Sequence, residues 1–600
     1  MRPHDLGLLR TPGVPTVSPD GRMAVVAVER LDLDADEYRG QLWAVPTDAS
    51  APARPISAGH RDSAPVFSPD GRWLAYLGAG RGERPQIWLL ATAGGEPRRL
   101  TDHPLGAGAP VWSPDSRRLA YVARVPEPGR YGTAAGIGPE AEPPRLITTL
   151  PFRPDGGGFL ADRPGQVFVL DLPAGLHDDA TPLPEPVQLT TATADCTDVA
   201  WRPDGAVLAF VAGGHPGADG GDVHEIGADG SGSRRVTAAG SGCAAPAYAP
   251  DGTLLVTAVP EPGDGYGLRV PCRVTSDGAL QPLLDPAEHP RGDLTPGTVL
   301  AGGAVLVGVA RRGAVHLLRV PLDGAPPETL VDGPFTVRGI AAAGDVVVAT
   351  VGHDRSAGEL LAISGAGRRL LSRFGAELGR TGRLHRAREL STTAPDGTPV
   401  HGRLTTPPGP GPHPVLLALH DGPAARSGWA LLDDVQVHAS AGYAVVQCAP
   451  GDDVLAALDA ALEDPALDRD RVGVLGAGEG GRRAALLVAG TDRFAAAVVE
   501  QPAPGSVDGS AVTAPTLVVQ AERDRCVPPE QGLYGQLVRR GVPAELLLFP
   551  GEAPHLARTG RPRHRLARLE HLLRWWARRL GSAELADHPG GVSDGDDVGR

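Results

Sequence analysis

Two patterns of hydrophobic and polar positions divide the chain. In the first two thirds, short apolar runs are separated by turn residues, and one phrase recurs: an aromatic or apolar residue, then x-Pro-Asp-Gly, then a second apolar run. Phe67-Ser-Pro-Asp-Gly-Arg-Trp-Leu-Ala-Tyr is a clear copy. Proline presets the first turn position, aspartate bonds to its own backbone, and glycine accepts a positive φ. The phrase therefore predicts a β-hairpin.

The phrase recurs at a period that indicates a repeat architecture. Its aspartates stand 40 to 50 residues apart, at Asp20, Asp70, Asp115, Asp155, Asp204 and Asp251. A second pair of strands follows in several copies, and four short strands in such a repeat are typical of a β-propeller blade. Two weaker copies cover 298–320 and 337–363, which makes seven or eight blades. We expect seven; an array of β-sandwiches is the alternative.

From about Glu389 the pattern changes to apolar strands that alternate with helices, after a hairpin at 393–404. Strands are predicted at 414–420, 443–448, 472–475, 494–499, 515–520 and 544–549. Helices are predicted at 429–441, 454–462, 479–489, 530–540 and 563–580. This alternation, with strands apolar on both faces, is typical of a doubly wound parallel sheet. The predicted domains are 1–375 and 376–582, followed by a Gly- and Asp-rich tail, 583–600, that we expect to be disordered.

Length, charge and cysteine spacing argue against several classes of function. Six hundred residues exceed what one core holds, and the net charge of −14 argues against nucleic acid or an anionic membrane as partner. No apolar run reaches the length of a membrane span, and no signal peptide is evident. The cysteines form no CxxC pair and no metal-ligand spacing, so we expect reduced thiols, a cytoplasmic protein, and no metal or cofactor. They are Cys196, Cys243, Cys272, Cys448 and Cys526.

The most informative segment is 471–481, Arg-Val-Gly-Val-Leu-Gly-Ala-Gly-Glu-Gly-Gly. It predicts a buried strand, a tight turn and the start of a helix. This is the setting of a nucleophile elbow, G-x-Ser-x-G, in which a sharp turn exposes the nucleophile above the sheet. Gly478 stands at the centre and has no side chain. An acid and a base that could serve a nucleophile follow as Asp524 and His555.

The order of these segments resembles the prolyl oligopeptidase family of serine peptidases, and most closely its acylaminoacyl-peptidase-like branch. The resemblance covers most of the chain and implies an N-terminal propeller and a C-terminal α/β-hydrolase domain. Five segments carry it, from the opening of the hydrolase domain through the HGGP oxyanion loop and the G-G-S-Y-G-G elbow to the Asp and His loops. They are 396–407, His420-Asp-Gly-Pro423, 468–481, Asp524-Arg-Cys-Val-Pro528 and Phe549-Pro-Gly-Glu-Ala-Pro-His555.

The resemblance assigns roles to four positions. His555 would be the base, and Asp524 would hold its tautomer. Gly422 and the amide of Glu479 fall at the oxyanion positions. The alternative is that Asp524 and His555 are ordinary loop residues, and one extra residue before His555 would displace its ring.

Three departures from the family's pattern each argue against serine-peptidase activity. Gly478 replaces the serine, and loss of a triad serine costs about 10⁶ in kcat in a well-studied protease. Asp421 places a carboxylate in the oxyanion loop, where it opposes the charge being stabilised. The hydrolase domain is shortened, because Cys448-Ala-Pro-Gly-Asp-Asp runs almost directly into the next helix. Glu479 is an alternative nucleophile, although a glutamate is also favoured at a helix start by the helix dipole.

The leading functional prediction is a homologue of this family that has lost serine-peptidase chemistry and binds peptides, acylated peptides or a protein partner. One alternative is an active serine-type peptidase or esterase on short or acylated peptides. Another is an interaction scaffold in which the propeller makes the contacts. The sequence leaves the chain's status as an enzyme open between these three.

Overall fold

The computed structural model describes residues 1–148, 159, 162–173, 182, 185–191, 194–213, 220–260, 269–291, 297–420, 428–448, 453–502, 509–524 and 532–581. The chain forms two compact units. We name them the propeller unit (Leu8–Glu377 with Gly428–Ala430) and the hydrolase unit (Met1–Gly7, Leu378–Ser427 and Leu431–Arg600). The predicted tail, 583–600, lies outside the described residues. In the described part of the chain, no helix is both long and apolar enough to cross a membrane.

The first seven residues group with the hydrolase unit, whereas the sequence analysis placed them with the repeats. The reason is local contact. The guanidinium of Arg383 binds the carboxylate of Asp5, with Nε 2.9 Å from Oδ2, and the side chain of Met1 is fully buried. A short 3-10 helix, η1 (Pro3–Leu8), forms this segment.

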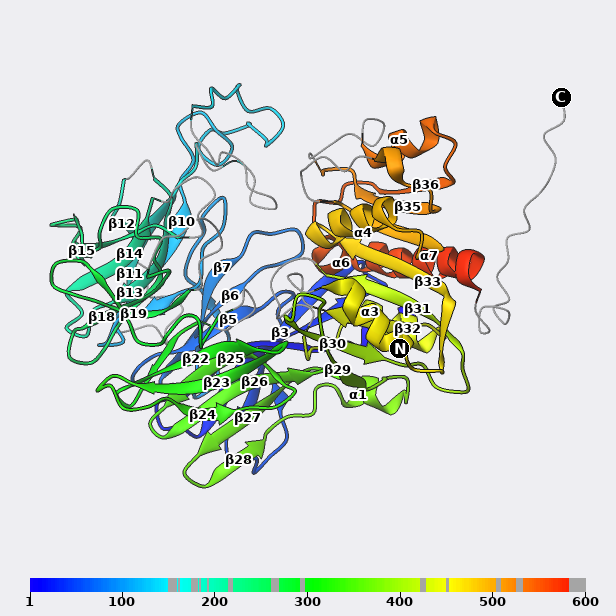
Figure 1. Cartoon of the computed structure of the whole chain (residues 1–600). Helices are drawn as coiled ribbons and strands as arrows, with labels where there is room; N and C mark the ends of the chain where they lie inside the picture. Colours follow the sequence, from blue (N-terminus) through cyan, green and yellow to red (C-terminus); the bar gives the residue numbers. More distant parts are fainter. Residues whose placement is uncertain are drawn as a thin grey trace. The chain divides into compact units, whose positions relative to one another are not determined.

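Among its described residues, the propeller unit has seven antiparallel groups of four strands in chain order, the last two joined in one eight-stranded sheet; they are drawn from blue to green in Figure 1. This agrees with the predicted blade number. Blades 1 to 4 comprise β1 (Thr11–Val17), β2 (Met23–Asp32), β3 (Glu37–Pro46), β4 (Arg54–Pro55); β5 (Ser63–Phe67), β6 (Trp73–Gly78), β7 (Gln86–Ala91), β8 (Arg98–Arg99); β9 (Val111–Trp112), β10 (Arg118–Arg124), β11 (Gly165–Asp171), β12 (Val187–Gln188); and β13 (Cys196–Trp201), β14 (Val207–Ala212), β15 (Asp222–Gly227), β16 (Arg234–Arg235). Blades 5 to 7 comprise β17 (Ala244–Tyr248), β18 (Leu254–Ala258), β19 (Val270–Val274), β20 (Leu280–Pro282); β21 (Val299–Ala301), β22 (Ala304–Arg311), β23 (Ala314–Pro321), β24 (Glu328–Val331); and β25 (Thr336–Ala343), β26 (Val346–His353), β27 (Ser356–Ser364), β28 (Gly367–Leu370).

Apolar side chains pack between neighbouring blades and close the ring. Val26 of blade 1 and Val348 of blade 7 belong to one buried cluster, so the first and last blades are in contact. Blades 6 and 7 are also joined directly, because β23 pairs with β25 through Val315 and Thr336. A closed ring leaves no blade with an unpacked face.

The recurrent phrase forms the turn between the first and second strands of a blade, as predicted. In blade 2 the buried Ser68 hydroxyl donates to Asp70 Oδ1 at 2.6 Å and accepts from the Trp73 amide at 3.0 Å. Gly71 takes φ 72°. Blade 1 repeats the arrangement with Ser18, at 2.5 and 3.0 Å.

One copy of the phrase falls, along the chain, between two strands of a single blade. β10 pairs directly with β11, so residues 125–164 connect two strands of blade 3. The copy at 152–156 lies in this connection and outside the described residues. Phrase counting alone therefore gave one unit too many, because a local turn signal does not specify which strands pair.

The hydrolase unit is built on one eight-stranded sheet, in the order β29-β30-β32-β31-β33-β34-β35-β36. The pairs β29/β30 and β30/β32 are antiparallel, and the strands from β32 to β36 are parallel, which agrees with the predicted hairpin and doubly wound sheet. The strands are β29 (Ala387–Thr393), β30 (Pro399–Thr405), β31 (His413–Leu419), β32 (Ala444–Cys448), β33 (Leu467–Ala477), β34 (Ala496–Glu500), β35 (Thr516–Ala521) and β36 (Ala544–Phe549). The helices are α1 (Ala376–Arg380, at the junction of the units), α2 (Asp433–Ser440), α3 (Val454–Leu462), α4 (Glu479–Gly490), α5 (Leu533–Arg539), α6 (Leu556–Thr559), α7 (Pro562–Leu580) and the 3-10 turn η2 (Gly509–Ala511).

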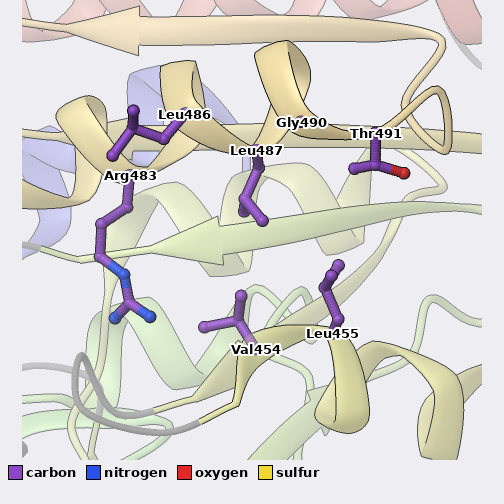
Figure 2. Close-up of a pocket in the computed structure, with 7 residues that line it drawn as sticks. All are labelled: Val454, Leu455, Arg483, Leu486, Leu487, Gly490 and Thr491. Carbon is purple, nitrogen blue, oxygen red and sulfur yellow. The ribbon is translucent and has the colours of Figure 1, made fainter.

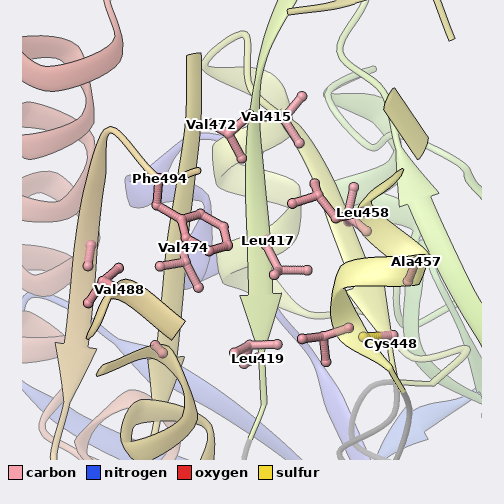
Figure 3. Packing of buried hydrophobic residues seen from close by; sticks show 14 of the residues in the cluster. Val415, Leu417, Leu419, Cys448, Ala457, Leu458, Val472, Val474, Val488 and Phe494 are labelled. Carbon is pink, nitrogen blue, oxygen red and sulfur yellow. The ribbon is translucent and has the colours of Figure 1, made fainter. Parts of the chain in front are cut away.

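The core of this unit lies between the central strands and helices α3 and α4. Figure 3 shows Leu417, Val474 and Phe494 packed together with Leu458 of α3 and Val488 of α4. All are buried. Because β31 and β33 are apolar on both faces, the sheet is covered on both sides and its polar groups gather at the strand ends.

Candidate functional site

The turn between β33 and α4 has the backbone of a nucleophile elbow. Gly478 takes φ 56° and ψ −121°, directly after β33 and before the first residue of α4. This region is costly for a residue with a side chain, and it is the strained conformation that a nucleophile elbow uses. The Gly478 amide donates to the Glu500 carbonyl at 3.0 Å. The elbow is thus formed, while position 478 carries no attacking atom.

The glycines around position 478 are required by close packing. A Cβ at Gly476 would lie 2.2 Å from the Gly480 carbonyl oxygen. A Cβ at Gly480 would lie 2.2 Å from the Leu419 carbonyl oxygen, at the end of β31, and one at Gly481 would lie 2.6 Å from the Glu500 carbonyl oxygen. The glycine pattern therefore keeps α4 against the carboxyl ends of β31 and β34.

The two residues that precede Asp524 are hydrogen-bonded to the predicted His loop. The Arg523 amide donates to the Glu552 carbonyl at 2.9 Å, and the Gly551 amide donates to Glu522 Oε2 at 2.6 Å. Half-buried Asp524 comes next and opens the predicted Asp loop, whose residues 525–528 lie outside the described residues. The segment that leads into Asp524 therefore meets the predicted His loop at the carboxyl ends of β35 and β36.

Position 555 is tied to the elbow through the end of β34. The His555 amide donates to Gln501 Oε1 at 3.2 Å, and Gln501 follows Glu500, whose carbonyl holds the elbow amide. His555 is exposed and takes φ 74° at the start of α6. Within the described residues, its hydrogen bonds are all made by its backbone, and none joins its ring to Asp524. The roles assigned to Asp524 and His555 stay predictions.

The two oxyanion positions differ in what the structure describes. Asp421 and Gly422 lie outside the described residues. Glu479 is the first residue of α4, where backbone amides point out of the N-terminal end of the helix. Its carboxylate pairs with Arg482, with Nε 2.8 Å from Oε2, and this hydrogen bond lowers the pKa of Glu479. A carboxylate held by a guanidinium is a poor candidate for a nucleophile.

A buried charged network supports the elbow, and the sequence analysis missed it. Glu500 at the end of β34 and Arg568 of α7 are both nearly inaccessible and form a bidentate pair, with Nε 2.6 Å from Oε2. Asp434 of α2 lies 3.6 Å from the ring of His420, the residue that opens the predicted oxyanion loop. The available signals were a glutamate that ends an apolar strand and an arginine within an apolar helix face.

The charges in this network shift the pKa values of its members. Burial would raise the pKa of Asp434, but the hydrogen bond and charge of His420 hold it well below its usual range. Burial lowers the pKa of fully buried His438 to about 4, because desolvation penalises the imidazolium. At pH 7 the network thus holds an ionised Asp434 and a neutral His438, beside the guanidinium of Arg568 that is paired with Glu500.

A separate cavity of about 280 Å³ lies between α3 and α4. Its walls are mainly apolar, from Val454 and Leu455 of α3 and Leu486 and Leu487 of α4, with Arg483 at its edge (Figure 2). None of the positions assigned to the triad or the oxyanion loop lines it. We therefore do not connect this cavity with acyl transfer.

Comparison with known proteins matches residues 433–571 to the Dienelactone hydrolase family. A curated relative, "Uncharacterized peptidase YuxL" from Bacillus subtilis (strain 168), is 28% identical over 255 residues. That match covers 32% of this chain and 39% of the relative, so it spans well under half of either protein.

Solved structures match nearly the whole chain. Pyrococcus horikoshii acylaminoacyl peptidase has a TM-score of 0.79 at 17% identity and covers 98% of this chain and 99% of its own. An acylaminoacyl peptidase in complex with Z-Gly-Gly-Phe-chloromethyl ketone has a TM-score of 0.79 at 16% identity, with 97% and 98% covered. A puromycin-hydrolyzing peptidase from Mycobacterium tuberculosis has a TM-score of 0.68 at 18% identity, with 97% and 96% covered. The chain has the fold of these peptidases, a propeller followed by an α/β-hydrolase domain.

Proposed function

We propose that this chain is a homologue of the acylaminoacyl peptidases that binds peptides or acylated peptides and does not cleave them. One observation carries the proposal: the elbow backbone is formed, and its apex is Gly478. Acyl transfer by this fold needs a nucleophile at that point, and a glycine supplies none. The close glycine packing and the buried charged network around this turn favour a site that still holds a ligand.

Peptide is the ligand that the comparisons favour, since a similar structure holds Z-Gly-Gly-Phe-chloromethyl ketone. A protein partner that presents an extended segment is the alternative. A cytoplasmic location belongs to the same proposal. It suits the buried thiols of Cys196, Cys243 and Cys272 and the absence of any disulfide among the described cysteines.

The test compares the wild type with Gly478→Ser, His555→Ala and the control Ala477→Ser. Each protein is incubated with a fluorophosphonate probe and with acyl-aminoacyl and peptidyl p-nitroanilides. We expect no labelling of the wild type and the same hydrolysis rate as His555→Ala. Gly478→Ser should gain labelling at position 478, whereas Ala477→Ser should not.

Ligand binding is measured on the same proteins by fluorescence polarisation with labelled N-acetylated tripeptides. The proposal expects saturable binding to the wild type. Probe labelling of the wild type at a mapped serine, or turnover that His555→Ala abolishes, would establish an active peptidase instead. Absence of any peptide binding would favour the propeller as an interaction scaffold.

A further inference from the structure

The cavity between α3 and α4 forms because the two helices cover different strands of the sheet. α3 packs mainly on β29, β30 and β32, whereas α4 packs mainly on β33 and β34, and β31 lies between these two sets. Small buried residues, among them Gly480, Gly481 and Ala484, bring α4 close to the sheet. Between the helices remains the cavity of about 280 Å³.

The walls of this cavity are an apolar surface that the sheet does not cover. On α4, Leu486, Leu487 and Gly490 line the cavity, and Leu486 keeps 43% of its surface exposed. A Cβ at Gly490 would meet no atom of the described residues within 4 Å, so there is space beside it. On α3, buried Val454 and half-buried Leu455 continue the wall outward from the core cluster. Covering such a surface with an apolar group releases water and is favourable.

Arg483 places a positive charge at one end of these apolar walls. Its side chain leaves α4 one turn before Leu486, and Figure 2 shows it extending toward α3, to the level of Val454. The residue is half-buried, so solvent reaches it. A guanidinium has five N–H donors in a planar fork that fits a carboxylate, so Arg483 can bind one in addition to its present contacts.

We propose that this cavity binds a carboxylate that carries a short aliphatic chain, such as a medium-chain fatty acid. The chain would lie along the apolar walls, and the carboxylate would bind Arg483. The volume of about 280 Å³ is just below the range of about 300–1,000 Å³ that is typical of small-molecule pockets, which limits the ligand to a short chain. The proposal concerns the cavity alone and does not depend on the chemistry at Gly478.

The first test is isothermal titration of the full chain with octanoate, octanamide and acetate. Octanamide keeps the chain and lacks the charge, whereas acetate keeps the charge and lacks the chain. We expect saturable binding of octanoate and at least tenfold weaker binding of the other two compounds. Equal affinity for octanoate and octanamide, or no saturable binding of octanoate, would overturn the proposal.

The second test asks whether octanoate binds in this cavity. Arg483→Gln should weaken octanoate binding at least tenfold and leave octanamide binding unchanged. Its control is Arg482→Gln, on the same helix and outside the cavity, which should bind octanoate like the wild type. Leu486→Asp places a carboxylate among the apolar walls and should abolish octanoate binding. Val538→Asp on α5 is the matched control, because the wild-type valine is similarly exposed, at 50%.

Thermal unfolding of the same proteins separates loss of the site from loss of the fold. Octanoate should raise the thermal midpoint of the wild type and of both controls, and not that of Arg483→Gln or Leu486→Asp. Full octanoate affinity in these two variants, or an equal loss in Val538→Asp, would place binding elsewhere and contradict the proposal. If a variant does not fold, the comparison of octanoate with octanamide on the wild type still decides. Fluorophosphonate labelling of Gly478→Ser is independent of these outcomes.

Discussion

The protein contains two kinds of tight glycine turn, and they are supported in different ways. In the blades, the Ser-Pro-Asp-Gly turn is held by its own side chains: the Ser68 hydroxyl bonds to exposed Asp70 and to the Trp73 amide. At the elbow, the turn has no side chain at its apex. It is held from outside, by the Glu500 carbonyl and by the packing of Gly480 on Leu419.

The difference shows that the backbone conformation of such an elbow can form without a nucleophilic side chain at its apex. A blade turn repeats with small variations, and each copy depends on a few short-range hydrogen bonds. The elbow depends on residues distant in sequence, above all on the buried Glu500–Arg568 pair beneath it. We therefore expect damage to the elbow's supports to be large and damage to one blade turn to be small.

The largest expected effect comes from Glu500→Gln. This change leaves Arg568 buried without a counter-charge, and breaking a buried pair from one side costs about 3–5 kcal/mol. Chemical denaturation followed by tryptophan fluorescence measures the change, because Trp575 and Trp576 lie in α7. The matched control is Glu545→Gln, which breaks the exposed pair with Arg578 on the same helix and should cost less than about 1 kcal/mol. If Glu500→Gln and Glu545→Gln lowered the unfolding free energy by similar amounts, the buried pair would not be a special support of the elbow.

A second effect of comparable size arises from pH, through His438 in the same network. The pKa of His438 is about 4 in the folded protein and near 6.5 when unfolded, so the unfolded state takes up a proton first as pH falls. Stability present above pH 6.5 should therefore be lost between pH 6.5 and 4, by about 3 kcal/mol at most. Asp434, whose pKa is lowered, contributes only below this window.

Unfolding by urea at pH 7 and at pH 4.5 measures this loss. His438→Gln removes the titrating group, so the difference between wild type and variant isolates His438 from the other histidines. Parallel pH profiles for the two proteins would show that the network does not respond to His438.

The sequence predicted features that depend on neighbouring residues, such as turns and helices, and did not predict pairings between residues far apart in the chain. The repeated turn phrase predicted a propeller of seven or eight blades, with seven expected, and the apolar runs predicted α3 at Val454–Leu462 as found. The phrase at Asp155 misled because β10 pairs with β11 across it. Glu500 and Arg568 were not predicted, since their pairing joins residues 68 positions apart. The geometry between the Asp and His loops has the same non-local origin.

A smaller effect should follow from placing a side chain at the elbow apex. Gly478→Ser puts a Cβ on a backbone with φ 56° and ψ −121°, which costs about 1–3 kcal/mol. The cost should appear in the unfolding free energy whether or not the variant gains reactivity. Ala477→Ser, one residue earlier and still in β33, should change stability by no more than about 0.5 kcal/mol. A neutral Gly478→Ser would mean that the elbow relaxes, and the backbone would then not be held from outside.

The smallest effect should come from a single blade turn. Ser68→Ala removes the bond to Asp70 and leaves the Trp73 amide without its acceptor, at a cost of about 1–2 kcal/mol. The equivalent change Ser18→Ala affects blade 1 in the same way. If each blade turn depends only on its own residues, the double variant should lose the sum of the two costs within about 0.5 kcal/mol. A clearly larger loss would show that neighbouring turns are coupled, and the propeller would then resemble the elbow in depending on support from outside each turn.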